Sequence, residues 1–392
     1  MGGEIDKAHP PPPASTAVIP DQPSSSVTAA RAPRFAPASP FTREVTAAVD
    51  GYFRARDLSP HADAAMRRKT ALVLAWAAAS YALVVAPGVP IAFRLLGSIA
   101  LGFGYAGIGM SIGHDAIHGA YSSRPWVNRL LGCGFDLIGA SSYAWRYTHN
   151  IAHHTYPNID DLDPDVDFDP VIRAVATRKW RPFQRAQWLY AYPIYALTGI
   201  RWVFYKDIAD LLRRRMGPYS DLRHPWWAWA LLLAGRTVAL GLVLVIPLLV
   251  VDAPRWQILL GAVLTWMTAG ATMASVFVLA HIVEGPAFSP PITGQIDDAF
   301  FDHQLRTTAD FACDNRFLAF YLGGLNFQVE HHLFPKVCSI HYPALRPIVR
   351  EIAARHGLPN HEFPTLAAAL AAHVSLLRRM GRKPAELDAG SA

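Results

Sequence analysis

Four long apolar stretches, arranged as two closely spaced pairs, constrain this 392-residue chain more than any other feature. The first pair predicts helices over about residues 70–86 and 91–113, separated by Pro-Gly-Val-Pro. The second pair predicts helices over about residues 226–251 and 256–280, separated by Asp-Ala-Pro-Arg. A helix rises about 1.5 Å per residue, so such segments can cross a hydrocarbon core about 30 Å thick. The pattern therefore predicts an all-α integral membrane protein with four transmembrane helices in two hairpins.

The composition supports a membrane protein and excludes several other classes. Apolar residues make up 52% of the chain and charged residues only 17%, which is unusual for a soluble domain and excludes disorder of the whole chain. Three scattered cysteines lack the spacing of a zinc site or a disulfide framework, so we expect reduced thiols. The net charge of +6 fits basic cytoplasmic loops, and we expect no nucleic-acid partner.

The regions outside the apolar stretches predict a simple domain organisation. The expected parts are a disordered Pro/Ser/Ala-rich tail over residues 1–40, an amphipathic lead-in helix over 41–69, a membrane domain over 70–383 and a flexible C-terminus over 384–392. Two less apolar stretches, residues 126–143 and 188–204, carry charges and are interpreted as interfacial or re-entrant helices.

The distribution of lysine and arginine predicts the orientation in the membrane. Basic residues precede the first expected span and are frequent in the connector between the hairpins, whereas the two opposite loops hold at most Arg94 and Arg255. Positive charge collects on the cytoplasmic side, so we expect the termini and the connector to be cytoplasmic and to form a cap. Arg236 lies inside the third expected span and either snorkels or faces the protein interior.

The histidines cluster where the expected helices reach this cytoplasmic side. They occur in the segments HDAIH, HNIAHH and QVEHH and at the end of the fourth span, and comprise His114, His118, His149, His153, His154, His281, His331 and His332. Residues four apart lie on one face of a helix, which is a spacing suited to metal binding. Three clusters on one face rarely arise from packing alone, whereas a single helix-end histidine such as His281 is usually structural.

Eight imidazoles exceed the capacity of one ion but suit two redox ions that keep positions open for oxygen. A metal pair at the edge of the membrane can share the electrons needed to cleave dioxygen, and so oxidise an unactivated methylene of an acyl chain. The ExxH carboxylate motifs of soluble di-iron bundles are not apparent, which indicates a ligand set dominated by histidine.

These segments resemble the membrane fatty acid desaturases, specifically their front-end, delta-6-like branch. HDAIH, WRYTHNIAHHTYPNIDDLDPDVD, HQLRTTADF and GGLNFQVEHHLFPKVCSIHYPALRPIV occur in the family's order, and the likeness covers about residues 66–383. The resemblance implies an iron-dependent, oxygen-consuming desaturase, a fatty acyl substrate on coenzyme A or lipid, and the eight histidines as ligands of two irons. Gln328 stands where other branches carry histidine and implies a ligand or ligand-orienting role.

Two departures from the family pattern affect these expectations. No haem-binding HPGG motif occurs in the first 65 residues, so electrons are expected from a separate ferredoxin or cytochrome b5-type protein. Stearoyl-type relatives carry asparagine four residues before the histidine equivalent to His281, whereas Phe277 stands here, so the resemblance alone assigns His281.

Several residues near the histidines are candidates for supporting roles. Asp115, Asn150 and Glu330 are candidates to orient ligands, while His303 and His341 are reserve ligands or surface residues. The acidic run over residues 160–169 is either a solvated turn or a source of carboxylates that accept ligand N–H groups. Four basic residues, Arg178, Lys179, Arg181 and Arg185, form either an ordinary cytoplasmic face or a docking site for a headgroup or an acidic electron donor.

Two other functions remain compatible with the sequence. A hydroxylase, epoxygenase or sphingoid-base desaturase would use the same histidines with a small change in substrate placement. A non-catalytic metal carrier would need polar ligands near mid-membrane, where the expected spans hold only Arg236. The expected localisation is a bacterial inner membrane with a cytoplasmic active site.

Overall fold

The computed structural model describes residues 33–384, which are mostly helical. Its first part comprises β1 (Arg34–Ala36), α1 (Pro40–Ala55), α2 (Ala64–Val85), α3 (Ile91–Gly107), the π-helix η1 (Ile108–Gly113), α4 (His114–Ile117), α5 (Pro125–Gly132), α6 (Gly134–Ile138), α7 (Ser142–Trp145) and the π-helix η2 (Arg146–His153). The middle part comprises the 3₁₀ helix η3 (Pro182–Ala186), α8 (Gln187–Arg201), the π-helix η4 (Trp202–Lys206), α9 (Asp207–Arg213), α10 (Trp226–Leu240), the π-helix η5 (Gly241–Val245), α11 (Ile246–Val250) and α12 (Arg255–His281). The last part comprises β2 (Gln295–Ala299), α13 (Phe300–Thr307), β3 (Ala309–Phe311), α14 (Arg316–Tyr321), α15 (Gln328–Leu333), the 3₁₀ helix η6 (Ser339–His341), α16 (Tyr342–Arg355), β4 (His361–Phe363) and α17 (Leu366–Met380).

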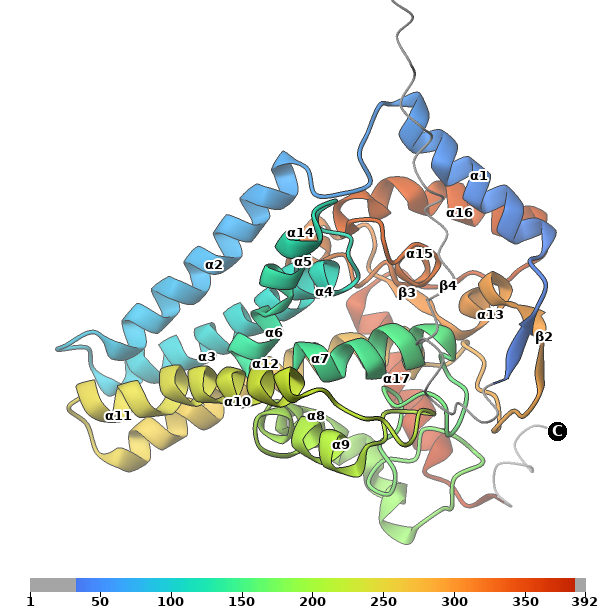
Figure 1. The fold of residues 1–392 in the computed structure, drawn as a ribbon. Helices are drawn as coiled ribbons and strands as arrows, with labels where there is room; N and C mark the ends of the chain where they lie inside the picture. The colour runs from blue at the N-terminus through green and yellow to red at the C-terminus, as the bar shows by residue number, and fades with distance from the viewer. Residues whose placement is uncertain (1–32, 385–392) are drawn as a thin grey trace, which may run out of the picture.

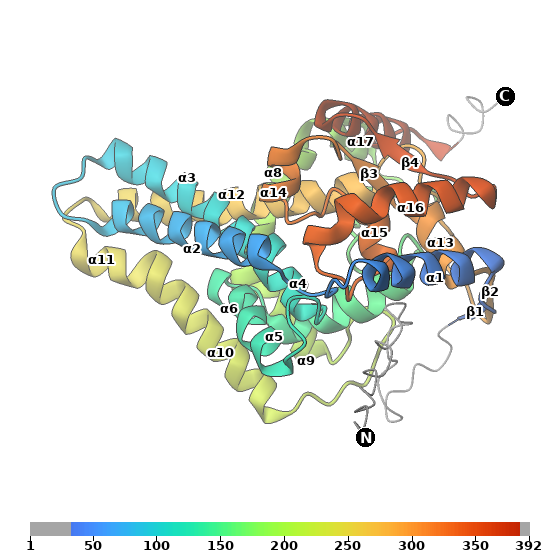
Figure 2. The same ribbon diagram turned by 90° about the horizontal axis from the view of Figure 1, so that it is seen from above.

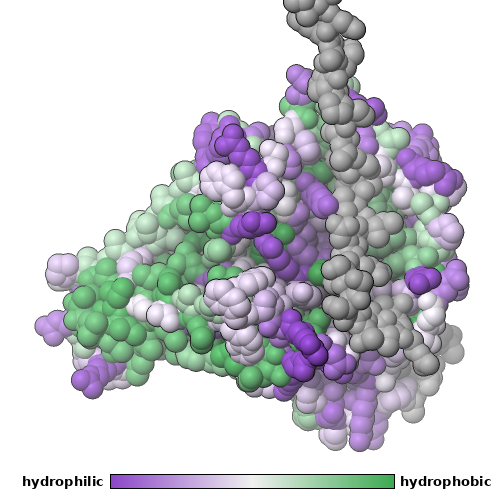
Figure 3. Space-filling model, viewed as in Figure 1, coloured by the Kyte–Doolittle hydropathy of each residue, from purple (hydrophilic) through white to green (hydrophobic). Residues whose placement is uncertain are grey.

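Four helices are long and apolar enough to cross a membrane, as expected: Ala64–Val85, Ile91–Ile117, Trp226–Val250 and Arg255–His281. They form the tapering end of the molecule, and the remaining helices gather at the broad end (Figures 1 and 2). The second and fourth are the inner pair, because 72% and 56% of their most apolar windows are buried, against 28% for each of the other two. Apolar side chains cover the outside of the tapering end (Figure 3).

The two inner helices are longer than a membrane requires. Each has 27 residues, or about 40 Å at 1.5 Å per residue, against a hydrocarbon core of about 30 Å. The second helix continues through η1 into α4 instead of stopping at the expected residue 113. Its last turns, and the end of α12, therefore reach beyond the apolar zone into the broad end of the molecule.

The first span begins six residues earlier than expected. The Asp63 side chain accepts a hydrogen bond from the backbone N–H of Met66 at 2.8 Å, so α2 has a capped N-terminus at Ala64. The basic residues that were expected to precede the span are consequently part of its first turns. Lys69 is even buried, which a hydropathy pattern does not reveal.

The segment before the first span also differs from the expectation. Helix α1 ends at Ala55, and its apolar stripe is buried in the broad end, where it packs against α16 and α13. The expected tail lies outside the described residues up to residue 32, but its last part is ordered: Arg34–Ala36 pairs in parallel with β2. This pairing uses backbone hydrogen bonds to a distant segment, which composition cannot predict. Of the expected flexible C-terminus, residues 385–392 lie outside the described part.

The expected interfacial stretches are helical but are tied to the spans. The first is broken into α5, α6 and α7, with a turn at Gly139, whose φ is +94°. The second forms α8, which packs along α12. The two helices approach most closely at Gly199 and Gly270, where a Cβ on either residue would clash with the opposite backbone.

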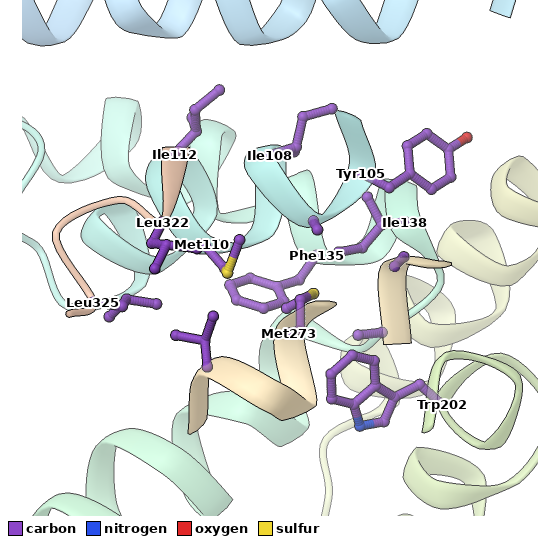
Figure 4. Close-up of a cluster of buried hydrophobic side chains, with 14 of the residues drawn as sticks. Tyr105, Ile108, Met110, Ile112, Phe135, Ile138, Trp202, Met273, Leu322 and Leu325 are labelled. Atoms are coloured by element: carbon purple, nitrogen blue, oxygen red, sulfur yellow. The ribbon is translucent and has the colours of Figure 1, made fainter. Parts of the chain in front are cut away.

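A buried apolar cluster joins the inner spans to the helices around them. Tyr105, Ile108 and Met110 from the second span meet Phe135 and Met273, from α6 and α12 (Figure 4). The π-helical segment η1 lies within this cluster and leads directly into α4. Such π segments occur frequently at functional sites, because the additional residue redirects the side chains that follow.

Arg236, which the sequence left without a partner, faces the protein interior. Its guanidinium donates to the Asp207 carboxylate at 2.7 Å and to the Trp202 carbonyl at 2.8 Å. Asp207 also accepts from the backbone N–H of Ser141. The buried pair therefore links α10 to η4, α9 and the start of α7.

The close crossing of α8 and α12 yields a test of the fold. We expect Gly199→Ala to destabilise the protein by about 1–3 kcal/mol, since the added methyl forces the two backbones apart. Gly51→Ala in α1 is the matched control, because nothing lies within 4 Å of its added Cβ. Thermal unfolding of both variants in detergent measures the difference, and equal melting temperatures would contradict this packing.

Candidate metal centre

All eight histidines singled out from the sequence lie together in the interior of the broad end. They come from the end of the second span, from η2 and the residue after it, from the last residue of α12, and from α15. Each is at most 9% exposed. Residues more than 200 positions apart in the chain thus contribute to one site.

The first group of histidines combines three separate segments. Its members His114, His118, His149 and His331 each place one ring nitrogen within 4.8 Å of the others. The Nε2 atoms of His114 and His149 are 3.1 Å apart. Ring nitrogens that converge in this way can bind one metal ion.

The second group consists of His153, His281 and His332, whose ring nitrogens also lie within 4.8 Å of one another. His154 stands between the two groups, with its ring centroid 4.6 Å from that of His118 and 4.4 Å from that of His332. His281, the least secure candidate from the sequence, is therefore part of the cluster. Its partners come from η2 and α15.

The grouping differs from the one that spacing suggests. His114 and His118, four residues apart, share a group as expected. His149 and His153 belong to different histidine groups, but they also form a third group together with Asp165. Their segment is the π-helix η2, and their rings are stacked with centroids 5.1 Å apart, so the two side chains still lie next to each other. The neighbours His331 and His332 are also divided, because successive helix residues point about 100° apart.

Several ring nitrogens in the cluster have no hydrogen-bond partner within the described chain. They include the Nε2 atoms of His118, His331 and His332 and both ring nitrogens of His154. Burial and the neighbouring imidazoles lower the pKa of His154, His331 and His332 well below the usual value, which favours neutral rings. Neutral, buried and unpaired imidazoles are suited to metal coordination.

The opposite ring nitrogens are held by partners that fix the orientation of the rings. Asp165 accepts from Nδ1 of His149 at 2.7 Å, and Asp163 accepts from Nδ1 of His153 at 2.9 Å. Gln304 on α13 accepts from Nδ1 of His332 at 2.8 Å. Such contacts leave Nε2 directed into the cluster and strengthen it as a donor.

Two further histidines have partners of the same kind. Nδ1 of His281 lies 3.1 Å from the carbonyl oxygen of Thr307, and Nδ1 of His331 lies 3.3 Å from the hydroxyl of Tyr342. The acidic run was interpreted either as a solvated turn or as a source of carboxylates that accept ligand N–H groups. Asp163 and Asp165 accept such hydrogen bonds. Gln304 and Tyr342 were not identified from the sequence, although both lie in segments that carry the family resemblance.

The residues predicted to orient ligands have other partners. Asp115 accepts from the backbone N–H and the hydroxyl of Ser339, because it points about 100° away from His114. The Asn150 side chain donates to the carbonyl of Ile117. Within the described chain, neither oxygen of Glu330 accepts a hydrogen bond. Burial, followed by the charge of Asp310, raises the pKa of Glu330 well above its usual range.

The remaining histidine and glutamine candidates have distinct positions. Gln328 is buried at the first residue of α15, three and four residues before the two α15 histidines, and its proposed role stays a prediction. His303 and His341, the reserve ligands, bond instead to the backbone carbonyls of Pro157 and His61.

The basic residues proposed for docking are largely engaged with the acidic run. Arg178 forms ion pairs with Asp160 and Asp161, and Arg181 pairs with Asp169. Lys179 and Arg185 belong to the same connector, upstream of α8. The charges of Arg178 and Arg181 are therefore neutralised within the protein.

Two cavities lie next to the histidine cluster, one lined by two of its histidines and the other beside the aromatic rings that contact His149. A polar cavity of about 730 Å³ is lined by His118 and His154 and by the cations Arg129, Arg146 and Lys336. The second, of about 330 Å³ and called the apolar cavity below for its larger apolar surface, is lined by Trp145 and Phe277, whose rings contact that of His149. Its rim also carries the charged residues Asp165, Asp167, Asp169, Arg201 and Lys206. An elongated molecule with a polar and an apolar end can therefore approach the cluster from these two cavities.

Comparisons with known proteins agree with this site. The family model described as fatty acid desaturase matches residues 90–364, a range that contains all eight histidines. The sn-1 linoleoyl-lipid 6-desaturase of Arthrospira platensis is 36% identical over 88% of this chain and 93% of that protein. The protein of the same description from Synechocystis sp. is 37% identical over 87% of this chain and 96% of that protein. The acyl-lipid (8-3)-desaturase of Physcomitrium patens is 31% identical over 87% of this chain and 71% of that protein.

The orienting carboxylates yield a test of the metal centre. We expect Asp163→Ala and Asp165→Ala to lower metal affinity about 10–100-fold, because each frees the ring it now holds. Asp167→Ala is the matched control, since Asp167 belongs to the same acidic run but is exposed and pairs with Arg178. Metal retained during titration with a chelator measures the effect, and equal retention in all three variants would exclude the orienting role.

Proposed function

The chain belongs to the fatty acid desaturase family and is a desaturase, and we propose that it forms a cis double bond at position 6 of acyl chains carried by membrane lipids. The resemblance of its histidine motifs to the front-end branch is confirmed by these relatives. The proposed substrate and position are supported by two relatives described as sn-1 linoleoyl-lipid 6-desaturases, each covered over more than nine-tenths of its length.

The observation that carries the proposal is the pair of histidine groups with unpaired inner nitrogens. Two iron ions fit this donor set, with His114, His118, His149 and His331 holding one ion and His153, His281 and His332 the other. His154, which lies between the groups, would complete either shell. Bound iron would supply the activation of dioxygen that removal of hydrogen from an unactivated methylene requires.

The two cavities suggest how the acyl chain lies beside the cluster. We assign the methyl end of the chain to the apolar cavity, where it would lie along Trp145 and Phe277. The lipid headgroup then lies in the polar cavity, beside Arg129, Arg146 and Lys336. Phe277 occupies the position where stearoyl-type relatives carry asparagine, and in this proposal it contacts the acyl chain.

Electrons in this proposal come from a separate ferredoxin or cytochrome b5-type protein on the cytoplasmic side. Positive charge supports that orientation, because basic residues are frequent around the histidine cluster and sparse at the tapering end. Arg94 at that end is occupied by the carbonyls of Val84, Ala86 and Val89, which close the turn after α2. A bacterial inner membrane with a cytoplasmic active site fits this distribution.

Of the two alternative functions, the metal carrier disagrees with the family and the site, whereas the hydroxylase would use the same site. A carrier without catalysis does not fit a chain of this family whose metal-binding groups lie outside mid-membrane. A hydroxylase would share the ligands and differ in where the acyl chain stops, so the product distinguishes the two activities.

The test is the fatty-acid profile of an aerobic host that is fed linoleic acid and expresses the full-length protein with a ferredoxin and its reductase. We expect a new acid with an additional double bond at position 6, located by mass spectrometry, and its loss in His149→Ala. His356→Ala is the matched control, because His356 pairs with Glu44 away from the cluster. A hydroxylated acid would contradict desaturation, and a double bond elsewhere would contradict the proposed position.

A further inference from the structure

A third cavity, of about 490 Å³, lies away from the histidines between α2, α14 and the start of α16. Three cations line it, Arg68 and Lys69 from α2 and Arg316 from α14, and its lining contains no aspartate or glutamate. The rest of the wall is mainly apolar and includes Leu72 and Phe320. The cavity therefore combines concentrated positive charge with a hydrocarbon-like surface.

Lys69 is the most informative residue of this cavity. Its side chain is only 4% exposed, and its ammonium lies 5.5 Å from the centre of the Phe320 ring. Among residues 33–384, no carboxylate lies within 4.0 Å of Lys69, Arg68 or Arg316. Lysine is almost never buried without a paired charge.

The carboxylate that acts on Lys69 from a greater distance is already engaged. Asp115 attracts Lys69 electrostatically, but it accepts hydrogen bonds from the backbone N–H and hydroxyl of Ser339 and from the thiol of Cys338. These bonds hold it behind the cavity wall, to which Ser339 belongs. The described chain thus leaves the charge of Lys69 without a contacting partner, and an external anion would provide one.

The position of the cavity indicates where that anion comes from. Helix α2 is a candidate span whose Leu72 is 61% exposed, and α14 presents Phe317, which is 68% exposed, on the outside of the molecule. Exposed aromatic and apolar side chains next to basic residues are typical of the membrane interface. Basic pockets at this level bind the headgroups of anionic lipids.

We propose that this cavity binds the phosphate of an anionic bilayer lipid, with Lys69, Arg68 and Arg316 around the phosphate and an acyl chain along Leu72 and Phe320. The substrate lipid is assigned to the two cavities beside Trp145 and His118, whose linings share no residue with this one, so the lipid proposed here is a second one. The apolar wall distinguishes a lipid from free phosphate, because a free ion gains nothing from burial against Leu72 and Phe320.

The bound lipid would also support the catalytic region. Ser339 lines the cavity and bonds to Asp115, the residue after His114. A phosphate beside Lys69 would hold the N-terminal end of α2 against this wall. Lipid binding therefore stabilises the contact between α4 and η6.

The test measures thermal unfolding of the full-length protein in micelles that contain phosphatidylglycerol or phosphatidylcholine. We expect phosphatidylglycerol to raise the melting temperature of the wild type by about 2–4 °C over phosphatidylcholine, since a ligand of the native state stabilises it. Lys69→Gln and the exposed Arg316→Gln should each lose most of this difference. Arg67→Gln is the matched control, because Arg67 is the exposed neighbour on α2 and does not line the cavity.

Three results would overturn the proposal. The first is an equal response of the wild type to both lipids. The second is a response of Lys69→Gln and Arg316→Gln as large as that of the wild type. The third is the same Lys69-dependent rise produced by glycerol phosphate alone, which would identify a site for a free phosphate instead of a lipid.

Discussion

The packing of eight buried imidazoles into one site is the constraint on which the rest of this structure depends. A buried polar nitrogen without a partner destabilises a fold by about 1–3 kcal/mol, and the cluster contains several of them. Within the described chain nothing else satisfies these nitrogens, and their arrangement in two convergent groups is suited to metal ions. The metal is therefore expected to contribute to folding as well as to catalysis.

The architecture brings these imidazoles together at the broad end of the molecule. The two inner spans exceed the hydrocarbon thickness, so that His114, His118 and His281 reach the broad end of the molecule. Segments far apart in the chain then provide the groups that hold the rings, Asp163 and Asp165 after η2 and Gln304 on α13. The rings of His149, His153 and His332 are thus fixed by segments other than their own, which keeps their inner nitrogens in place.

Local sequence patterns predicted the apolar helices and the histidine motifs, because both depend on residues that are near one another in the chain. Hydropathy located the four candidate membrane helices, and the spacing and position of the histidines identified the members of the cluster other than His281, which the family resemblance assigned. The assignment of His149 and His153 to different histidine groups was not predicted, because it depends on which distant histidines lie against each ring. The early start of α2 follows from the Asp63 cap, a signal that hydropathy ignores.

The sequence did not predict several side-chain partners, because these partners come from segments that are distant in the chain. Asp115 and Glu330 lie within histidine motifs, yet Asp115 is directed to Ser339 and Glu330 lies beside Asp310. Asp163 was visible only as part of an acidic run, and Gln304 had no distinguishing pattern at all. The partner of Arg236, likewise, became evident only when α10 was placed against α9.

The central claim is that the cluster holds two iron ions, one in each histidine group. It is tested most directly by the metal content of the purified full-length protein, measured by mass spectrometry of the elements against quantitative amino-acid analysis. The account predicts two irons per chain and a magnetic coupling between them in Mössbauer spectra. A single iron per chain, or two zinc ions in protein from iron-replete cells, would contradict it.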